Sequence, residues 1–439
     1  MIIVDLDENR TSKENRGRLS YWKLKIGKDF TLPTFFPLLD SQEKINAYNN
    51  TKQITGLKNI EGTIIPILKL WKLSISGIKS NGIFIIDPCI WKFFYKGIDE
   101  DTLNWLQNKR CANKKIQQLY SKLCGVPSGE GSMRRKNEIK MELAPAISNF
   151  YREFLKLQVD YKPHAVLSLD IPIFGDYSQT IEWQDENGKT TKICWIDLAI
   201  NVIKLCQSIA KGLHPQYDFF AILSIHNGVL NDEVEKPKEL NENVWDYLID
   251  KIVTIDADGL IIRFIPQLQS VQRAYRFIGK LRDKVGDKMI IAFNMQEVAY
   301  GLIWNGLDAF SCEVSRKPQK GGKGKSGVKP KGTEGGWYHP QYKIIWSRKE
   351  LMEHMKSQNL HKVPCNCKIC TKLTLDSIKQ MARPHWRIYT KEHYLEVKNE
   401  EIKFIREGLE NKTLRGVLQS NFFRETKNPD LLEVAEAIE

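Results

Sequence analysis

The feature that most constrains the fold is an alternation of short apolar segments with amphipathic segments of helical period, between about residues 60 and 315. The apolar segments are rich in β-branched residues, and several end at a polar or turn residue, as strands do. They read NGIFIIDP, AVLSLDIPIF, DFFAILSIHNG, TIDADGLIIRF, KMIIAFNM and GLDAFSCEV, and the helical segments include TTKICWIDLAINVIKLCQSIAKGL and VQRAYRFIGKLRDKV. This repeated order predicts a parallel sheet of the α/β class, and it favours a closed (β/α)8 TIM barrel over an open doubly wound sheet.

Chemistry in such a barrel is expected where its strands end. Functional side chains of TIM barrels come from the carboxyl ends of several strands, which meet at one mouth. Asp87, Asp170, His226 and Asn227 each stand at the end of a predicted strand. We therefore expect these four side chains to gather at the same mouth.

A second constraint lies near the C-terminus, where the chain reads VPCNCKICTKLTLDSIKQMARPHWRIYTKEHYLEV. The spacing C-x-C-x-x-C brings three thiolates into one tight turn, and a later histidine completes a tetrahedral set. Cys365, Cys367, Cys370 and His393 therefore predict a structural zinc site with no open coordination position. His385 competes with His393 for the fourth position, and three unrelated thiols in a loop are the alternative to a metal. From His393 onward the pattern predicts a helix.

Charge and composition point toward nucleic acid. The 439 residues carry a net charge of +13, with 66 Lys and Arg against 53 Asp and Glu. A field of this sign favours polyanions, although Lys-, Ile- and Asn-rich composition also reflects an AT-rich genome. The start of the chain lacks the pattern of a signal peptide, and its apolar runs fall short of the roughly 20 residues of a membrane span. We expect a soluble, cytoplasmic protein without a membrane partner.

The basic charge is densest in RKPQKGGKGKSGVKPKGTEGGW, which has seven Lys or Arg and seven Gly. It cannot bury a core, so it is either a solvated loop or an arm that grips nucleic-acid phosphates through Arg316, Lys317, Lys320, Lys323 and Lys325. The predicted organisation is a flexible N-terminus over 1–20, a catalytic barrel over 21–315, this loop over 316–337, a zinc-binding subdomain with closing helices over 338–425 and a tail over 426–439.

A barrel followed by this cysteine motif resembles the tRNA-guanine transglycosylase superfamily. GRLSYWKLKIGKDFTLPTFFPLLDS is similar to the family's opening hairpin and its TP-x-FxPV entry into the barrel, and LSLDIPIF is similar to LDIPTP. GIFIIDPCIWKF stands where the family has ILTDSGGYQ, and IIAFNMQEVAYGLIWNGLDAFSCEV resembles the segment ending GIDMFDCV. The resemblance covers about residues 18–425, in order.

The resemblance implies base exchange through a covalent glycosyl-enzyme intermediate, with two carboxylates as in retaining glycosidases. Asp87 matches the family's acid/base aspartate, and Asp170 matches the aspartate that holds the Watson–Crick edge of the base. Trp91 stands near the aromatic residue that stacks on the base. The structural alternatives are a helix N-cap for Asp87, a turn for Asp170 and a core position for Trp91.

The departures from the family lie in its reactive segments. The nucleophilic aspartate of FDC is replaced by Ser311, which leaves Glu313 and Asp308 as carboxylate candidates for the nucleophile, and leaves open an inactive homologue. The family's QGG becomes His226, Asn227 and Gly228, and Arg263 stands where a glycine lets the base approach. These residues are expected to form a rebuilt base pocket.

Three functions follow from these features. The first is a Dpd-type transglycosylase, which replaces guanine in DNA with a 7-deazaguanine derivative, as a homodimer or with partner proteins of a DNA-modification system. The altered pocket, the basic loop and the absence of an RNA-binding PUA domain favour it. The second is a transglycosylase acting on tRNA. The third is a catalytically inactive zinc protein that binds nucleic acid.

Overall fold

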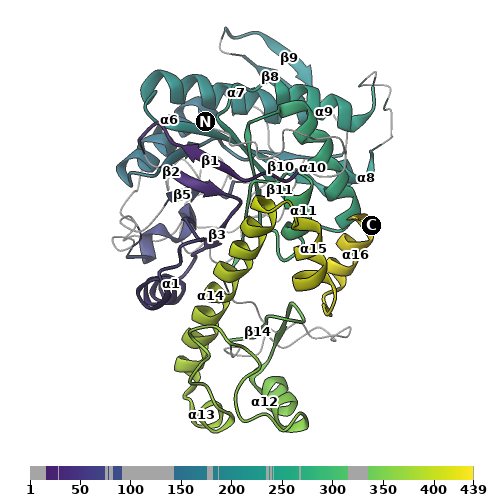
Figure 1. Ribbon diagram of the computed structural model, residues 1–439. Coiled ribbons are helices and arrows are strands. Elements are labelled where there is room, and N and C mark those ends of the chain that lie inside the picture. The colour runs from purple at the N-terminus through teal and green to yellow at the C-terminus, as the bar shows by residue number, and fades with distance from the viewer. Residues whose placement is uncertain are drawn as a thin grey trace, which may run out of the picture.

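A curled parallel sheet forms the centre of the molecule in the computed structural model (Figure 1). The structure describes residues 16–74, 83–90, 143–175, 181–233, 240–314 and 335–438, except for a few positions within these ranges, and also Ile78 and Pro237. The strands of the sheet are β3 (Thr34–Leu38), β4 (Gly62–Pro66), β5 (Ile83–Asp87), β6 (Ala165–Leu167), β7 (Pro172–Ile173), β10 (Asp218–His226), β11 (Gly259–Ile265), β12 (Met289–Phe293) and β13 (Ala309–Glu313).

The strands follow one another in one continuous series. Neighbouring strands run β5-β4-β3-β13-β12-β11-β10-β6, every pair is parallel, and β7 pairs with β10 beyond the end of β6. The two edges of this series also meet, because the backbone N–H of His164, just before β6, donates to the carbonyl of Phe84 on β5 at 2.9 Å. The predicted α/β architecture is thus confirmed as a curled eight-position sheet, consistent with a (β/α)8 barrel.

One predicted strand is interrupted. AVLSLDIPIF forms β6 and β7, with Ser168–Ile171 between them. Ser168 replaces part of the ladder there, because its Oγ accepts the N–H of Ile222 on β10 at 2.8 Å. Pro172 at the start of β7 has no N–H to donate to a ladder. Asp170 therefore lies in a local irregularity of the sheet rather than within a strand.

Apolar side chains fill the inside of the curled sheet. Phe36, Phe220, Ile222, Ile261 and Phe293 belong to one buried cluster there. An antiparallel hairpin, β1 (Ser20–Lys23) and β2 (Asp29–Leu32), closes the amino-terminal end of the strands by adding Trp22, Leu24, Phe30 and Leu32 to that cluster. The carboxyl ends, where chemistry is expected, lie at the opposite end.

Helices cover the outside of the sheet and pack their apolar faces against it. They are α1 (Gln42–Thr55), α6 (Leu143–Asp160), α7 (Trp195–Leu213), α8 (Asn227–Asn231), α9 (Val244–Val253), α10 (Val271–Val285) and α11 (Ala299–Trp304), with the 3-10 turn η1 (Ile67–Lys72) after β4. A separate hairpin, β8 (Ile181–Gln184) and β9 (Thr190–Ile193), precedes α7.

A smaller lobe projects from the sheet at the far end of one long helix, α14 (Arg383–Glu410) (Figure 1). It contains the hairpin β14 (Trp337–His339) and β15 (Ile344–Trp346), and helices α12 (Arg348–Ser357) and α13 (Leu375–Gln380). Its own core includes Trp337, Leu351, Met355 and Trp386. This lobe begins near the predicted boundary of the zinc-binding subdomain.

The described residues at both ends of the chain contact the rest of the molecule. Arg16 pairs with Asp283 at 2.7 Å, inside the segment predicted to be flexible. After α15 (Leu414–Leu418) and the π turn η3 (Gln419–Phe423), the predicted tail forms α16 (Pro429–Ile438), which buries Leu431 and Val434. Among the described residues, no helix has the length and apolar character needed to cross a membrane.

Candidate functional site

One arginine joins the two aspartates that the sequence predicted to meet. Arg263 Nη2 lies 2.7 Å from Asp87 Oδ2, and Arg263 Nη1 forms an ion pair with Asp170 Oδ2. The three side chains come from β5, from the break between β6 and β7, and from β11. We call this group the mouth triad. All three residues are at most 5% exposed.

Backbone geometry fixes the remaining carboxylate oxygens of the triad. After β5 the chain turns at Pro88 and Cys89, and Cys89 has a φ of 56°. This turn aims the N–H of Cys89 at Asp87 Oδ1, at 3.0 Å, and the N–H of Ile90 at Asp170 Oδ1, at 2.7 Å. Each aspartate is therefore held between a guanidinium and a backbone donor, which fixes its orientation.

Burial and charge separate the two aspartates electrostatically. Burial raises the pKa of Asp170 to about 7. The positive charge of Arg263 opposes this shift, and the negative charge of Asp87 adds to it. Burial also disfavours ionisation of Asp87, but the charge and hydrogen bond of Arg263 outweigh it and lower the pKa of Asp87. Two carboxyl groups with pKa values moved apart are suited to a division of roles, one holding a proton and one ionised.

Arg263 reaches this position from the inside of the sheet. On β11 it pairs in register with Ser224 of β10 and Phe293 of β12, and its guanidinium carbon lies 5.2 Å from the centre of the Phe293 ring. Arg263 was predicted to contact the base. In the structure Arg263 instead forms an ion pair with Asp170, the aspartate that was predicted to bind the base. The Asp170 carboxylate is therefore not available to accept hydrogen bonds from the edge of a guanine.

His226, Asn227 and Gly228 lie at the carboxyl end of β10, as predicted. His226 caps α8, and its Nδ1 accepts the N–H of Gly228 at 3.1 Å. Its ring lies 5.6 Å from that of Phe174, which follows β7.

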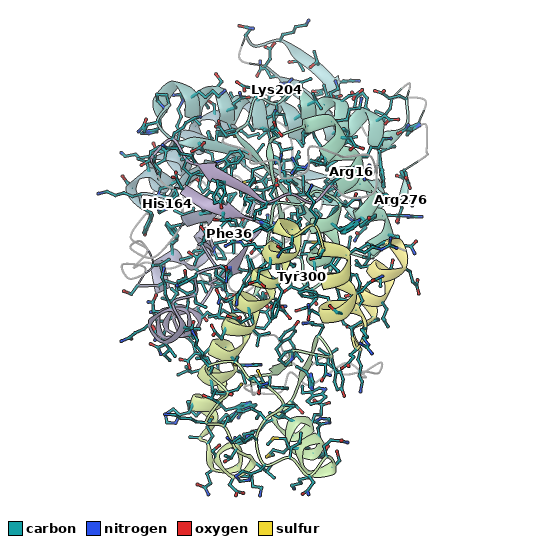
Figure 2. The ribbon with its side chains drawn as sticks, in the orientation of Figure 1. Arg16, Phe36, His164, Lys204, Arg276 and Tyr300 are labelled. Atoms are coloured by element: carbon teal, nitrogen blue, oxygen red, sulfur yellow. The ribbon has the colours of Figure 1, made fainter. Side chains whose placement is uncertain are left out.

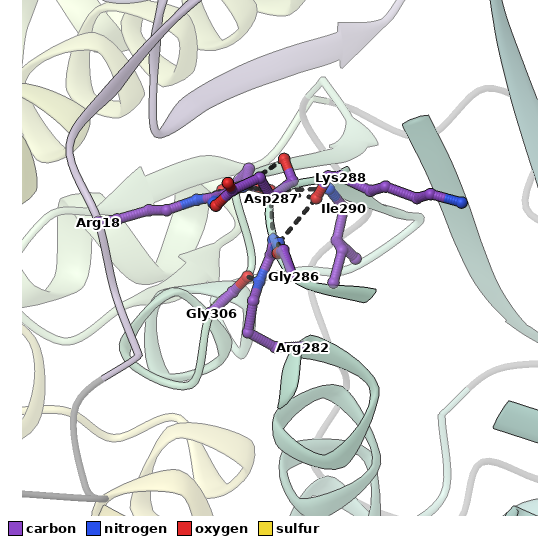
Figure 3. Close-up of polar contacts among 8 residues, drawn as sticks. Arg18, Arg282, Gly286, Asp287, Lys288, Ile290 and Gly306 are labelled. Atoms are coloured by element: carbon purple, nitrogen blue, oxygen red, sulfur yellow. Dashed lines mark hydrogen bonds and ion pairs between the residues drawn. The ribbon is translucent and has the colours of Figure 1, made fainter. Parts of the chain in front are cut away.

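The structure does not bring Asp308 to the mouth. Asp308 precedes β13, at the amino-terminal end of the sheet, and is 1% exposed. Its carboxylate accepts from Arg18 Nε at 2.9 Å, from the Ile290 N–H at 2.7 Å and from Arg282. Figure 3 shows the side chains of Arg18 and Arg282 pointing toward the same group of polar contacts, beside Asp287 and Ile290. Asp308 is a structural anchor of the amino-terminal end, so its prediction as a catalytic candidate is wrong.

The other nucleophile candidates lie on β13. Ser311 is buried, with only 2% of its surface exposed. Glu313 is the exposed last residue of the strand and pairs in register with Leu38 of β3. Ser311 and Glu313 share one face of β13 because side chains alternate along a strand. Within the described ranges, no hydrogen bond or ion pair joins either of them to the triad.

Six further predicted residues cannot be placed. Trp91 and the basic residues Arg316, Lys317, Lys320, Lys323 and Lys325 lie outside the described residues. Their assignments to base stacking and to nucleic-acid binding stay predictions.

The three cysteines and His393 converge in the smaller lobe. Their ligand atoms lie within 4.8 Å of one another. His393 Nδ1 is 3.1 Å from Cys370 Sγ, 3.4 Å from Cys367 Sγ and 3.9 Å from Cys365 Sγ. A tetrahedral zinc with bonds of about 2.3 Å to sulfur and about 2.0 Å to nitrogen places these atoms roughly 3.5 Å apart. The cluster could therefore hold zinc.

The surroundings of His393 fit that assignment. Its Nε2 lies 2.6 Å from the carbonyl oxygen of Tyr338, so a proton on Nε2 leaves Nδ1 free to ligate. Its ring stacks on that of Trp337, with the ring centroids 4.9 Å apart and an angle of 7° between the ring planes. His385 is exposed and is not part of the cluster, which resolves the choice between the two histidines in favour of His393.

A buried charged network, which the sequence analysis did not identify, joins this lobe to the sheet. Lys398 on α14 donates to Tyr300 at 2.9 Å, to Tyr338 at 3.0 Å and to Glu401 at 2.8 Å, and pairs with Glu297 at 3.1 Å. Figure 2 marks Tyr300 beside α14. Lys398 and Glu401 are three residues apart on a helix, and such a pair ordinarily indicates an exposed helix face, so sequence alone gives no signal of burial.

Comparison of the chain with protein-family models and with curated proteins finds no match in either case.

Proposed function

We propose that this chain is a base-exchange transglycosylase that replaces guanine in DNA with a 7-deazaguanine derivative. The observation that carries the proposal is the mouth triad, since two buried carboxyl groups with opposite pKa shifts stand together at the carboxyl ends of a curled parallel sheet. The resemblance of the strand-end segments to guanine transglycosylases supplies the reaction class.

The proposed reaction proceeds through two displacements at the anomeric carbon of a nucleotide that is turned out of its stack. In the first, a carboxylate oxygen, assigned to Glu313, bonds to C1′ as the bond from C1′ to N9 of guanine breaks. Guanine takes a proton as it leaves. In the second, N9 of the incoming 7-deazaguanine loses its proton, bonds to C1′ and releases the carboxylate.

The pKa shifts in the triad bear on which aspartate gives a proton to the departing guanine. The resemblance gives the acid/base role to Asp87, whose pKa is lowered by Arg263. Asp170, with a pKa raised to about 7, is the better holder of a proton near neutral pH. We therefore propose that Asp170 shares the acid/base role with Asp87, and that Arg263 must release Asp170 before that carboxyl group can contact a base.

Zinc would be held by Cys365, Cys367, Cys370 and His393, and would stabilise the smaller lobe without entering the reaction, because four protein ligands leave no coordination position for substrate. The residues that would take part in the proposed reaction lie instead in the mouth triad, where backbone N–H groups orient Asp87 and Asp170.

One observation favours the inactive alternative. Arg263 engages both aspartates at once, and Ser311 stands where the family has its nucleophile, so a nucleic-acid-binding protein without activity would also fit this mouth. A transglycosylase acting on tRNA keeps the same chemistry with another polynucleotide.

A single assay separates these three functions. The purified protein is incubated with tritiated 7-deazaguanine bases and either duplex DNA or unmodified tRNA, and label in the polynucleotide is counted. The proposal predicts label in DNA. Label only in tRNA would replace DNA with tRNA as the substrate, and no label in either, with 7-cyano and 7-aminomethyl bases both tried, would favour the inactive protein.

A further inference from the structure

The end of the smaller lobe that surrounds α13 is strongly basic. The segment from His361 to Lys391 contains seven Lys and Arg and a single acidic residue, Asp376. Figure 1 shows α13 at the end of the lobe that lies farthest from the curled sheet. The proposed chemistry of the mouth triad makes no use of this surface.

Four of the basic side chains lie close together around α13 and are exposed. Lys362 pairs through a β-bridge with Thr374, which caps the start of α13, and Lys372 precedes that cap by two residues. Lys379 lies in the last turn of α13, and Arg383 begins α14. Because α13 has six residues, it is about 9 Å long, close to the Debye length of about 8 Å at physiological ionic strength. The four cations, here called the basic tip, therefore act together on a charged partner.

Little of the charge of the basic tip is neutralised. Asp376 pairs with Lys379 at 3.0 Å, but both side chains are exposed, so water and salt screen the pair. Among the described residues, no ion pair joins Lys362, Lys372 or Arg383 to a carboxylate. A zinc-loaded cluster of three thiolates and one neutral histidine would add one negative charge nearby, which is less than the excess of cations.

Helix α14 places the basic tip on the same side of the sheet as the mouth triad. Near the C-terminal end of α14, Arg406 donates to the carbonyl of Pro33, just before β3, at 2.8 Å. Nearer its N-terminal end, Arg387 and Lys391 share the carboxylate of Glu43 on α1, beyond the carboxyl end of β3. Followed toward its N-terminus, α14 thus passes from the amino-terminal to the carboxyl-terminal end of the strands. The basic tip therefore projects beyond the carboxyl ends.

An exposed basic surface on this side fits a phosphate backbone. A nucleotide that enters the mouth remains joined to its strand, and every phosphate of that strand carries a negative charge. Lys and Arg side chains that contact the phosphates release condensed counterions, which favours binding and makes it depend on salt. Such contacts position the polynucleotide and carry no sequence information.

We propose that the basic tip binds the phosphate backbone of the DNA whose base enters the mouth, through Lys362, Lys372, Lys379 and Arg383. The identity of the polynucleotide rests on the proposed function, but the binding itself requires no base exchange. The partner is recognised by its charge, so the contribution of the basic tip to affinity falls with rising salt and does not depend on the sequence of the DNA.

The test is a fluorescence anisotropy titration of the zinc-loaded, full-length protein with a labelled short DNA duplex, at several concentrations between about 50 and 200 mM salt. The test variant carries Lys362→Gln, Lys372→Gln and Arg383→Gln together. It is expected to bind at least tenfold more weakly than the wild type at the lowest salt. The slope of log affinity against log salt should become shallower by about 2–3, since each lost phosphate contact removes about 0.9.

The matched control removes three charges at the amino-terminal end of the sheet. It carries Lys23→Gln, Lys58→Gln and Lys162→Gln, three exposed lysines on or next to β1, β4 and β6. The control should bind DNA with nearly the affinity and the salt slope of the wild type. An equal loss in the test and control variants would overturn the proposal, because it would reflect net charge and not the basic tip.

Three further results would also overturn the proposal: no binding of DNA by the wild type at the lowest salt, wild-type affinity and slope in the test variant, or a loss confined to tRNA in parallel titrations. If the test variant loses zinc, its three substitutions are measured singly. Each should make the slope shallower by about 0.9, and three unchanged slopes would be equally contrary. A protein that binds DNA through the basic tip without exchanging bases would contradict only the proposed reaction.

Discussion

Arg263 Nη2 lies 2.7 Å from Asp87 Oδ2, across the inside of the curled sheet from β11 to β5. The same guanidinium also holds Asp170, so one cation compensates two buried carboxyl groups. This arrangement both stabilises the fold and occupies the proposed base site. The contribution of Arg263 to the stability of the fold can be measured by replacing it.

Replacement of Arg263 by Met should destabilise the protein by about 3–5 kcal/mol, because it leaves two buried carboxyl groups without their cation. The measurement is the free energy of unfolding in urea at pH 7. Arg276→Met is the control, since Arg276 is an exposed arginine that pairs with Glu233 on the surface, and it should cost only about 0–1 kcal/mol. Equal losses in the two variants would show that the triad does not depend on Arg263.

The raised pKa of Asp170 predicts a specific pH dependence of stability. Its folded pKa of about 7 exceeds the roughly 3.9 of an unfolded aspartate, so the folded state binds the proton more tightly. The resulting stabilisation is fully present below about pH 4 and is lost as the pH rises to about 7. Asp170→Asn should therefore be relatively more stable, compared with wild type, at pH 8 than at pH 5.

Urea unfolding at the two pH values checks this expectation. Asp376→Asn, at an exposed position on α13, serves as the control. The raised pKa would be contradicted if the difference in free energy of unfolding between the wild type and Asp170→Asn were the same at pH 5 and pH 8.

Loss of the cysteine cluster should affect the fold more than the reaction. Cys367→Ser and His393→Ala are each expected to lose zinc and to lower the unfolding temperature, because the smaller lobe has a small core of its own. Zinc is measured by elemental analysis of the purified protein. His385→Ala is the matched control on the same helix and should keep both properties. A Cys367→Ser protein with full zinc content and unchanged unfolding temperature would argue against a structural metal.

The buried network at α14 should be one of the stronger links between the lobe and the sheet. Lys398→Met leaves Glu297 and Glu401 partly uncompensated, so we expect a loss of about 3–5 kcal/mol in the free energy of unfolding. Lys403→Met, at an exposed position of the same helix, should change it by less than about 1 kcal/mol. Limited proteolysis should also release the lobe faster in Lys398→Met than in Lys403→Met.

The parallel sheet and the cysteine cluster could be predicted because their signals are local. Alternating strand and helix periods identify a parallel sheet, and the spacing of Cys365, Cys367 and Cys370 identifies a possible metal loop. His393 could be narrowed to one of two histidines, but only its position in space decides between them. Asp87 and Asp170 were predicted to meet because carboxyl ends of parallel strands share one edge of a sheet.

Other features of the site depend on contacts between residues that are distant in the sequence. Asp308 lies three residues from Ser311, yet the length of β13 places it at the opposite end of the sheet, among Arg18 and Arg282. Arg263 stands on a strand whose neighbours are apolar, and nothing in that run indicates a partner on β5. The burial of Lys398 likewise depends on tyrosines that are distant in sequence.

The most direct test of the central claim is trapping of the covalent intermediate. The protein is incubated with guanine-containing DNA and no incoming base, denatured, and examined for a protein–DNA adduct by gel and mass spectrometry. The account predicts an adduct in the wild type, its loss in Glu313→Gln, and its strong reduction in Asp87→Asn. An adduct that forms equally in both variants would contradict the assigned site, and the absence of any adduct with DNA or tRNA, together with no base exchange, would contradict the enzymatic account.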